Sequence, residues 1–197
     1  MNNMVFAVAT NNQKKLKEIQ RILDSFGITA KTLKELDISV EIEENGTTFE
    51  ENAVIKAKTI AEMCGLPTIS DDSGLEVDAL DGAPGVYTAR FAGENATDDD
   101  NIDKLLESLE DVEKADRTAR FVSAVCLYMP DGRHTVCRGS CEGWIGFERI
   151  GDGGFGYDPV FMVGEESYSQ MTPQQKDAIS HRGSALRQLK EQIKQFI

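Results

Sequence analysis

The chain opens with an apolar run, a polar turn and a helical pattern. Residues 5–9 are continuously apolar, which is typical of a short strand covered on both faces. Asn11 and Asn12 interrupt this run, and from Lys14 apolar residues recur at the spacing of an amphipathic helix until Gly27. Glycine often ends a helix because it tolerates the left-handed conformation. The pattern predicts a strand, a turn and a helix in that order.

Two further helices are predicted from their N-terminal caps. Thr48 and Glu51 match a capping box ahead of an apolar helical stretch, and a buried strand end follows at residues 68–70. Thr97 and Asp100 match the same motif ahead of the clearest amphipathic helix in the middle of the chain. The first part of the chain therefore alternates strands with helices.

The second half is richer in strand patterns. Residues 119–129 contain the Phe, Val and Tyr side chains that are typical of strands. A Pro-Asp-Gly turn and a short strand at 135–137 follow, as in a hairpin. A further strand is predicted at 143–149, and a last helix after Ser184.

Helices that alternate with strands, followed by consecutive strands, indicate an α/β protein. We expect a mixed central β-sheet flanked by helices, arranged as two lobes with a substrate cleft between them. The 197 residues are enough for a well-packed core, and 40% of them are hydrophobic. Residues 1–197 are therefore expected to form one domain with two lobes.

Charge and cysteine content exclude several classes of function. The formal net charge is −13, so general binding to DNA or RNA is not expected, because it needs clustered Lys and Arg. A triphosphate site on so acidic a chain requires a local group of cations, a metal ion, or both. The four cysteines form no CxxC pair and no zinc-ligand spacing, and Cys126 and Cys137 are predicted to be small core residues.

The distribution of apolar and charged residues shows neither a membrane-spanning segment nor a signal peptide. No apolar run approaches the roughly 18 residues that span a bilayer. Residues 1–10 lack the charged start and apolar stretch of a signal peptide. A cytoplasmic location is expected.

Five polar clusters fall where predicted strands end or helices begin, and each has an ordinary structural alternative. The clusters are residues 10–15 (TNNQKK), 43–53 (EENGTTFEENA), 70–74 (SDDSG), 151–159 (GDGGFGYDP) and 180–184 (SHRGS). The first lies at a helix N-terminus, where backbone N–H groups and the helix dipole hold phosphate, although a helix cap with solvated lysines explains it equally well.

Carboxylates in the second and third clusters are candidates for metal binding. Asp71 and Asp72 follow a predicted strand, and a hard cation relieves the repulsion between neighbouring acids; the alternative is a polar turn with solvated acids. Glu43 and Glu44 precede a helix cap and are free to bind a metal. Lys56 of the same helix points either to phosphate or to solvent.

The last two clusters suit recognition of a base. Glycine lets the backbone approach a flat ligand, and an aromatic side chain such as Phe155 in such a loop stacks on a base. His181 and Arg182, with Lys176 upstream, donate hydrogen bonds. Such donors suit a 6-oxo base or an anion.

Together, and in this order, the motifs resemble those of the inosine/xanthosine triphosphate pyrophosphatases. The matching segments are residues 10–15, 43–53, 70–74, 82–85 with Ala89 and Arg90, 155–158 and 180–183. The resemblance covers nearly the whole chain. It implies Mg²⁺-dependent hydrolysis of ITP, dITP and XTP between the α and β phosphates, which gives the monophosphate and pyrophosphate, in a homodimer of two-lobed α/β subunits.

The resemblance also implies a role for individual residues. Asp72 would act as the base that activates water, with Asp71 sharing the catalytic role. Glu43 and Asp72 would hold Mg²⁺, and Phe155 would stack on the purine. Further contacts with substrate would come from Thr10, Asn11, Asn12, Gln13, Lys14, Lys15, Lys56, Ser73, Gly156, Tyr157, Asp158, Lys176, His181 and Arg182.

Asn11 and Lys14 depart from the family pattern, in which both positions are commonly glycine. Asn adopts positive φ more readily than most residues, so Asn11 is expected to preserve the turn. Lys14 is expected either to contact phosphate or to face solvent. Two other functions stay open, a non-catalytic nucleotide-binding or regulatory module and a pyrimidine or dUTP pyrophosphatase. Carboxylates unmatched by a metal repel a phosphate, which favours an enzyme over a simple binding module.

Overall fold

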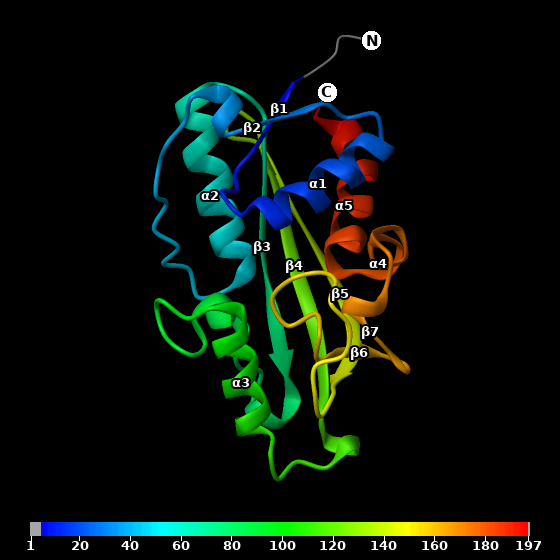
Figure 1. The fold of residues 1–197 in the computed structure, drawn as a ribbon. Coiled ribbons are helices and arrows are strands. Elements are labelled where there is room, and N and C mark those ends of the chain that lie inside the picture. Colours follow the sequence, from blue (N-terminus) through cyan, green and yellow to red (C-terminus); the bar gives the residue numbers. More distant parts are fainter. Residues whose placement is uncertain (1–4, 197) are drawn as a thin grey trace. The chain divides into compact units, whose positions relative to one another are not determined.

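The structure is a computed structural model that describes residues 5–196. Positions 1–4 and 197 lie outside the described residues. The predicted domain, residues 1–197, includes all five of them, and the segment at residues 1–10 that was compared with a signal peptide includes the first four. Within the described range the chain has a mixed α/β fold, as predicted (Figure 1).

Within residues 5–196, seven strands form one mixed sheet in the order β2-β1-β3-β4-β5-β6-β7. At one edge β1 pairs in parallel with both β2 and β3, and at the other edge β6 pairs antiparallel with both β5 and β7. The strands are β1 (Phe6–Val8), β2 (Ala30–Thr32), β3 (Thr68–Val77), β4 (Thr118–Tyr128), β5 (His134–Ile145), β6 (Phe161–Val163) and β7 (Glu166–Ser167).

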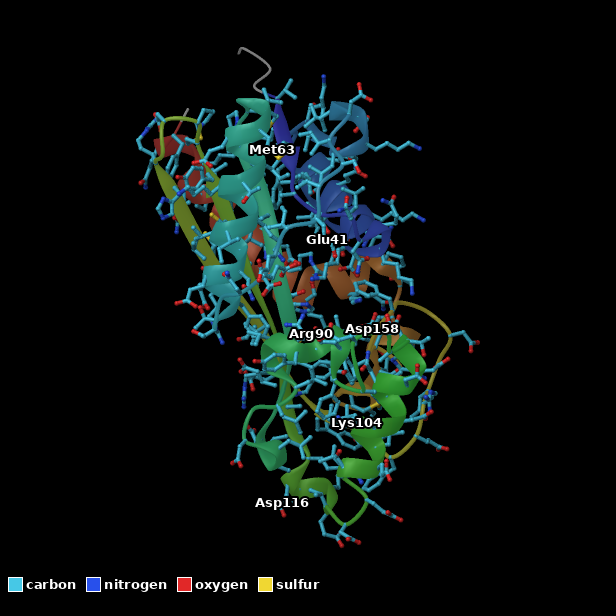
Figure 2. The ribbon with its side chains drawn as sticks, turned by 90° about the vertical axis from the view of Figure 1, so that its left-hand side faces the viewer. Glu41, Met63, Arg90, Lys104, Asp116 and Asp158 are labelled. Atoms are coloured by element: carbon cyan, nitrogen blue, oxygen red, sulfur yellow. The ribbon has the colours of Figure 1, made fainter. Side chains whose placement is uncertain are left out.

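The described residues also form five α-helices, and none of these is long and apolar enough to cross a membrane. They are α1 (Gln13–Ser25), α2 (Phe49–Cys64), α3 (Asp98–Ser108), α4 (Pro173–Ile179) and α5 (His181–Gln192). The side chains of both these helices and the strands are drawn in Figure 2, where Met63 marks the end of α2 and Lys104 marks α3.

The predicted helix starts are confirmed. The Thr48 side chain accepts a hydrogen bond from the Glu51 amide at the start of α2, and Thr97 forms a complete capping box with Asp100 at the start of α3. In α2 the Glu51 carboxylate bonds to Thr47, one residue before the cap, at 2.7 Å from its amide. Each helix therefore begins where a side chain satisfies an amide that has no partner within the helix.

The described residues divide into two compact units. The first comprises residues 5–72, 123–139 and 181–196, and the second comprises residues 73–122 and 140–180, so residues of β3, β4 and β5 belong partly to each. In the first unit α1 and α5 pack together on one side of the strands, and α2 lies on the other (Figure 1). In the second unit α3 packs on the apolar side chains of β3, β4 and β5. The expected substrate cleft between two lobes stays a prediction.

Two strand predictions are wrong in extent. The strand predicted to end at residue 70 continues through the acidic cluster, because residues 70–74 lie inside the ten-residue strand β3. Ion pairs and hydrogen bonds satisfy its buried acids there, so a strand of unusual polarity is stable. The separate strands expected at 135–137 and 143–149 are one strand, β5, which ends at Ile145.

Short elements near the C-terminus were also missed. The last helix begins at His181 and not after Ser184, and α4 precedes it. As a result His181 and Arg182 lie in the first turn of α5 instead of in a loop. Strands β2, β6 and β7 have only two or three residues each, too few for a recognisable alternation of polar and apolar positions.

Candidate active site

Asp71 and Asp72 are consecutive residues of β3, and alternation along the strand turns their side chains to opposite faces. The Asp71 side chain is fully buried, and that of Asp72 is 11% exposed. Each carboxylate has its own basic partners in the first unit. The two predicted catalytic acids therefore occupy different environments.

Asp71 is held by two cations and a hydroxyl. Arg182 donates from Nε and Nη2 to the two carboxylate oxygens, each at 3.1 Å, and Lys15 Nζ lies 3.2 Å from Oδ2. Ser123 Oγ donates to Oδ1 at 2.5 Å. Burial by itself would raise the pKa of Asp71, but Arg182 and Lys15 outweigh it and hold the pKa well below its usual value. The partners of Asp71 therefore favour its ionised form and bond to both of its oxygens.

The Arg182 guanidinium lies between two carboxylates. Besides Asp71 it forms a short ion pair with Glu18 of α1, and its side chain is 1% exposed. The contact of Arg182 with the base edge or with phosphate stays a prediction; in this structure its guanidinium donates to two protein carboxylates. A buried guanidinium needs carboxylate partners, and here both come from the protein itself. Arg182 therefore binds both oxygens of Asp71.

The first motif supplies a helix cap and one cation. The Asn12 side chain accepts hydrogen bonds from the amides of Lys14 and Lys15 at 3.0 and 3.1 Å, so the ordinary cap interpretation of Asn12 is confirmed. Lys15 leaves 18% of its side chain exposed beside Asp71. Burial lowers the pKa of Lys15 and outweighs the attraction of Asp71. Thr10 is half-buried, while Asn11, Gln13 and Lys14 are exposed, and their contacts with substrate stay predictions.

The turn at Asn11 does not use a left-handed backbone. Among the described non-glycine residues, only Asp37 and Asp81 have a positive φ. The expectation that Asn11 preserves a glycine-like conformation is therefore wrong. Because the backbone at this turn does not need a positive φ, a residue other than glycine is accommodated at position 11.

Asp72 shares a lysine with Glu44. Lys56 Nζ of α2 lies 2.8 Å from Asp72 Oδ1 and 2.9 Å from Glu44 Oε2. Burial would lower the pKa of Lys56, but Asp72 and Glu44 outweigh it and raise the pKa. For Asp72 burial prevails and raises the pKa despite the attraction of Lys56. Lys56 thus faces the acids, and not solvent.

Glu44, and not Glu43, is the acid beside Asp72. Glu43 is exposed, whereas Glu44 bonds to Lys56. A one-residue difference in position therefore separates the exposed acid from the one that bonds to Lys56. Glu44 therefore lies where Glu43 was expected, and the binding of a metal by Glu43 stays a prediction.

In the second unit a basic side chain supports Phe155. Asp158 Oδ2 accepts hydrogen bonds from the Phe155 amide at 2.8 Å and from Lys176 Nζ at 2.6 Å. The Lys176 ammonium lies 4.8 Å from the centre of the Phe155 ring, within range of a cation–π interaction. Asp158 and Lys176 are both buried, and Figure 2 labels Asp158. These contacts fix the backbone and the ring of Phe155.

The rest of this loop is tightly packed. A Cβ atom at Gly154 would lie 2.0 Å from Asp158 Oδ2, so only glycine fits there. The Gly156 amide donates to Asp98 of α3 at 2.9 Å. Tyr157 is buried and donates from its hydroxyl to the Thr88 carbonyl at 2.9 Å, so it is a core residue that shapes the loop.

Two predicted substrate-contact residues have still to be placed, and two residues that support the site were not predicted. Ser73 is half-buried in β3, and His181 is buried at the start of α5; their contacts with substrate stay predictions. Glu18 and Ser123, which hold Arg182 and Asp71, were not identified from the sequence. Glu18 lies three positions after Lys15 on α1, and this helical spacing was a signal that both share one face.

The fold and these ion pairs define a mixed α/β protein whose first unit gathers acids and bases around β3. The family model described as the Ham1 family matches residues 6–192. This chain belongs to the Ham1 family.

Named relatives agree with this assignment. The dITP/XTP pyrophosphatase of Exiguobacterium sibiricum is 48% identical over 196 residues, which cover 98% of this chain and 99% of the relative. The dITP/XTP pyrophosphatase of Vibrio parahaemolyticus is 47% identical over 190 residues, or 94% of each chain. A solved HAM1 protein from Coxiella burnetii is 42% identical with a TM-score of 0.87, covering 98% of this chain and 99% of its own.

Proposed function

We propose that this protein hydrolyses inosine- and xanthosine-type nucleoside triphosphates, such as dITP and XTP, to the monophosphate and pyrophosphate. The proposal is supported by full-length similarity to relatives that carry the name dITP/XTP pyrophosphatase. The observation that carries it in this molecule is the pair of carboxylates, Asp72 and Glu44, that share the Lys56 ammonium. Carboxylates that can hold a metal and a lysine that can bind phosphate are groups used in metal-assisted phosphoryl transfer.

The donor atoms of this acid pair fit Mg²⁺. Mg²⁺ prefers oxygen ligands and is usually held by one or two carboxylates together with phosphate oxygens. Asp72 and Glu44 contribute such oxygens, and both lie within hydrogen-bonding distance of one nitrogen. Among residues 5–196, no three His, Cys, Asp or Glu side chains gather into a metal site, so substrate phosphates would complete the coordination. When bound, Mg²⁺ neutralises the triphosphate and polarises phosphorus.

Side chains of the first unit are assigned to the reacting phosphate. Asp72 orients a water molecule and accepts its proton while the water oxygen bonds to the α phosphorus, and the bond from that phosphorus to the bridging oxygen breaks. Pyrophosphate leaves with the electron pair of that bond. Lys15 and Lys56 stabilise the negative charge on the phosphates. Asp71 contributes by holding Lys15, since its own oxygens are already bonded.

Phe155 and His181 are assigned to the base. The ring of Phe155 stacks on the purine, and Lys176 and Asp158 hold that ring in place. The His181 imidazole donates to an oxygen at position 6 of the purine, where adenine has an amino group. A site that sets donor against donor can reject the wrong base by roughly 10⁴.

The test is a panel of dITP, XTP, GTP, ATP and dUTP with Mg²⁺, in which pyrophosphate and orthophosphate are measured separately. We expect monophosphate and pyrophosphate from dITP and XTP, very little turnover of ATP, and a nearly complete loss of activity in Asp72→Asn. Binding of dITP without turnover would indicate a regulatory module. Preference for dUTP would indicate a pyrimidine enzyme, and release of orthophosphate would contradict cleavage between the α and β phosphates.

We further propose that the protein acts as a homodimer in the cytoplasm, where the nucleotide pool is found. The resemblance to the pyrophosphatase family supports the dimer. Light scattering coupled to size-exclusion chromatography will measure the mass of the particle. A particle of 21.7 kDa would be a monomer and would contradict the dimer.

A further inference from the structure

Helices α2 and α3 begin with the same sequence device. Thr48 and Thr97 are the N-caps, and an asparagine follows four residues later in each, Asn52 and Asn101. Both asparagines are 3% exposed although they lie in the first turns of their helices. A buried amide must satisfy both its carbonyl oxygen and its NH₂ group. The partners of these two amides therefore reveal what each one holds.

Asn101 connects its helix to a backbone segment. Its Oδ1 accepts from the Ala92 amide at 2.8 Å, and its Nδ2 donates to the Ala89 carbonyl at 3.1 Å. Both partners belong to the peptide backbone ahead of α3. Asn101 is a structural residue that fastens this segment.

Asn52 connects its helix to a backbone segment and to an acid. Its Oδ1 accepts from the Gly46 amide at 2.8 Å, in the same manner as Asn101. Its Nδ2, however, donates to Oδ2 of Asp72 at 3.4 Å. The Asn101 amide donates to a neutral carbonyl. The Asn52 amide instead donates to the Asp72 carboxylate, which we propose activates the attacking water.

Asn52 and Lys56 act on Asp72 as a pair. They are four residues apart on α2 and so share one face of the helix. Lys56 bonds to Oδ1 of Asp72, and Asn52 bonds to Oδ2. Donors on both oxygens determine the rotation of the carboxylate as well as its position.

The other end of the Asn52 amide restrains the segment that carries Glu44. Gly46 lies two residues after Glu44, and a Cβ atom at Gly46 would come within 2.6 Å of Asn52 Oδ1. The segment therefore passes so close to Asn52 that only glycine fits. The Asn52 side chain thus contacts Asp72 and also restrains the segment that carries Glu44.

We propose that Asn52 is a positioning residue for the reaction, which aligns the Asp72 carboxylate and holds the Glu44 segment beside it. This inference rests on the proposed function for its effect on catalysis. Its structural half, the restraint of the Glu44 segment, is independent of any activity. Asparagine is suited to this task because it offers a donor to Asp72 and an acceptor to Gly46 at the same time.

Two substitutions separate the two contacts. Asn52→Asp keeps an acceptor for Gly46 but places a carboxylate against Asp72, and Asn52→Ala removes both contacts. Asn101→Asp is the matched control, because it makes the same change at a buried asparagine with neutral partners. We expect Asn52→Asp to lower kcat for dITP by about ten- to hundredfold, the effect of losing a hydrogen bond to a charged group, with little change in KM. Asn101→Asp should leave kcat near the wild-type value.

Limited digestion with a Glu-specific protease tests the structural half without substrate. Cleavage after Glu43 or Glu44 should accelerate several-fold in Asn52→Ala and stay close to wild type in Asn52→Asp and Asn101→Asp. Thermal unfolding of each variant checks that it is folded. If Asn52→Asp and Asn101→Asp lost kcat equally, or if Asn52→Ala were cleaved at the wild-type rate, the positioning role would be overturned. If the wild-type protein released no pyrophosphate from dITP, the proposed function would fail, while the digestion result would still decide the restraint of the segment.

Discussion

Asp71 and Asp72 are neighbours in β3, yet their carboxylates are bound by different cations from different helices. Arg182 of α5 and Lys15 of α1 hold Asp71, whereas Lys56 of α2 holds Asp72. The pKa of Asp71 is lowered by its partners, and burial raises that of Asp72. We infer a division of labour in which Asp71 organises the basic residues and Asp72 meets the reacting water.

Asp72→Asn should nearly abolish activity and preserve the fold. The amide keeps the shape of the side chain but removes the charge assigned to metal and water, and loss of a general base costs about 10²- to 10⁴-fold in rate. Steady-state kinetics with dITP at saturating Mg²⁺ measure the loss, with Asp116→Asn at an exposed position as the control. Retention of most of kcat would show that Asp72 is not the base.

Arg182→Ala should destabilise the protein strongly. The substitution leaves the carboxylates of Asp71 and Glu18 buried without their shared partner, and breaking a buried ion pair typically costs about 3 to 5 kcal/mol. Urea unfolding measures this change in the free energy of unfolding. Unchanged stability, combined with a loss of turnover for dITP but not for ATP, would instead restore the predicted contact of Arg182 with the base.

Phe155→Ala should raise KM for dITP more than it lowers the melting temperature. Stacking of an aromatic ring on a base contributes about 1 to 3 kcal/mol, so KM should rise by about five- to 150-fold. Phe147→Ala, at an aromatic residue of the second unit that is 57% exposed and outside the motifs, is the matched control. A lower melting temperature with unchanged KM would identify Phe155 as a packing residue.

The buried cysteines should resist alkylation. Cys126 and Cys137 are core residues of β4 and β5, as predicted, and burial raises the pKa of both, to about 12 for Cys126. Iodoacetamide reacts with the thiolate, so at pH 8 it should label the half-buried Cys64 first and leave activity intact. Mass spectrometry of the labelled protein identifies the sites. Rapid labelling of Cys126 in the folded protein would contradict this assignment.

The same shift in pKa has a consequence for stability. The unfolded Cys126 thiol ionises near pH 8.5, whereas the folded one keeps its proton to about pH 12. Above about pH 8.5 the unfolded state therefore gains by losing the proton, and stability falls as pH rises. Cys126→Ser or Cys126→Ala should unfold with a weaker dependence on pH between about 8.5 and 10 than the wild-type protein. Identical pH dependence would show that the thiol does not contribute.

Local patterns were sufficient to predict much of this protein. The apolar spacing after Lys14 and the caps at Thr48 and Thr97 depend on residues a few positions apart, so the helices they predict are present where expected. The order of the motifs along the chain also identified the family, because a set of short motifs is specific even when each member is weak. The charged and glycine-rich clusters are also short local segments, so the sequence by itself indicated candidates for phosphate and base recognition.

Tertiary structure alone decided which side chain faces which. Glu43 and Glu44 are equivalent in the sequence, but only the folded chain places Glu44 against Lys56. Arg182 looked like a ligand-binding donor, and 111 positions separate it from Asp71, to which it bonds. The acidic run at residues 70–74 was not recognised as part of a strand, because the cations that make a buried strand of this polarity stable come from α1, α2 and α5. A charge in the interior is stable only beside its partner, and partners this distant along the chain are brought together by folding.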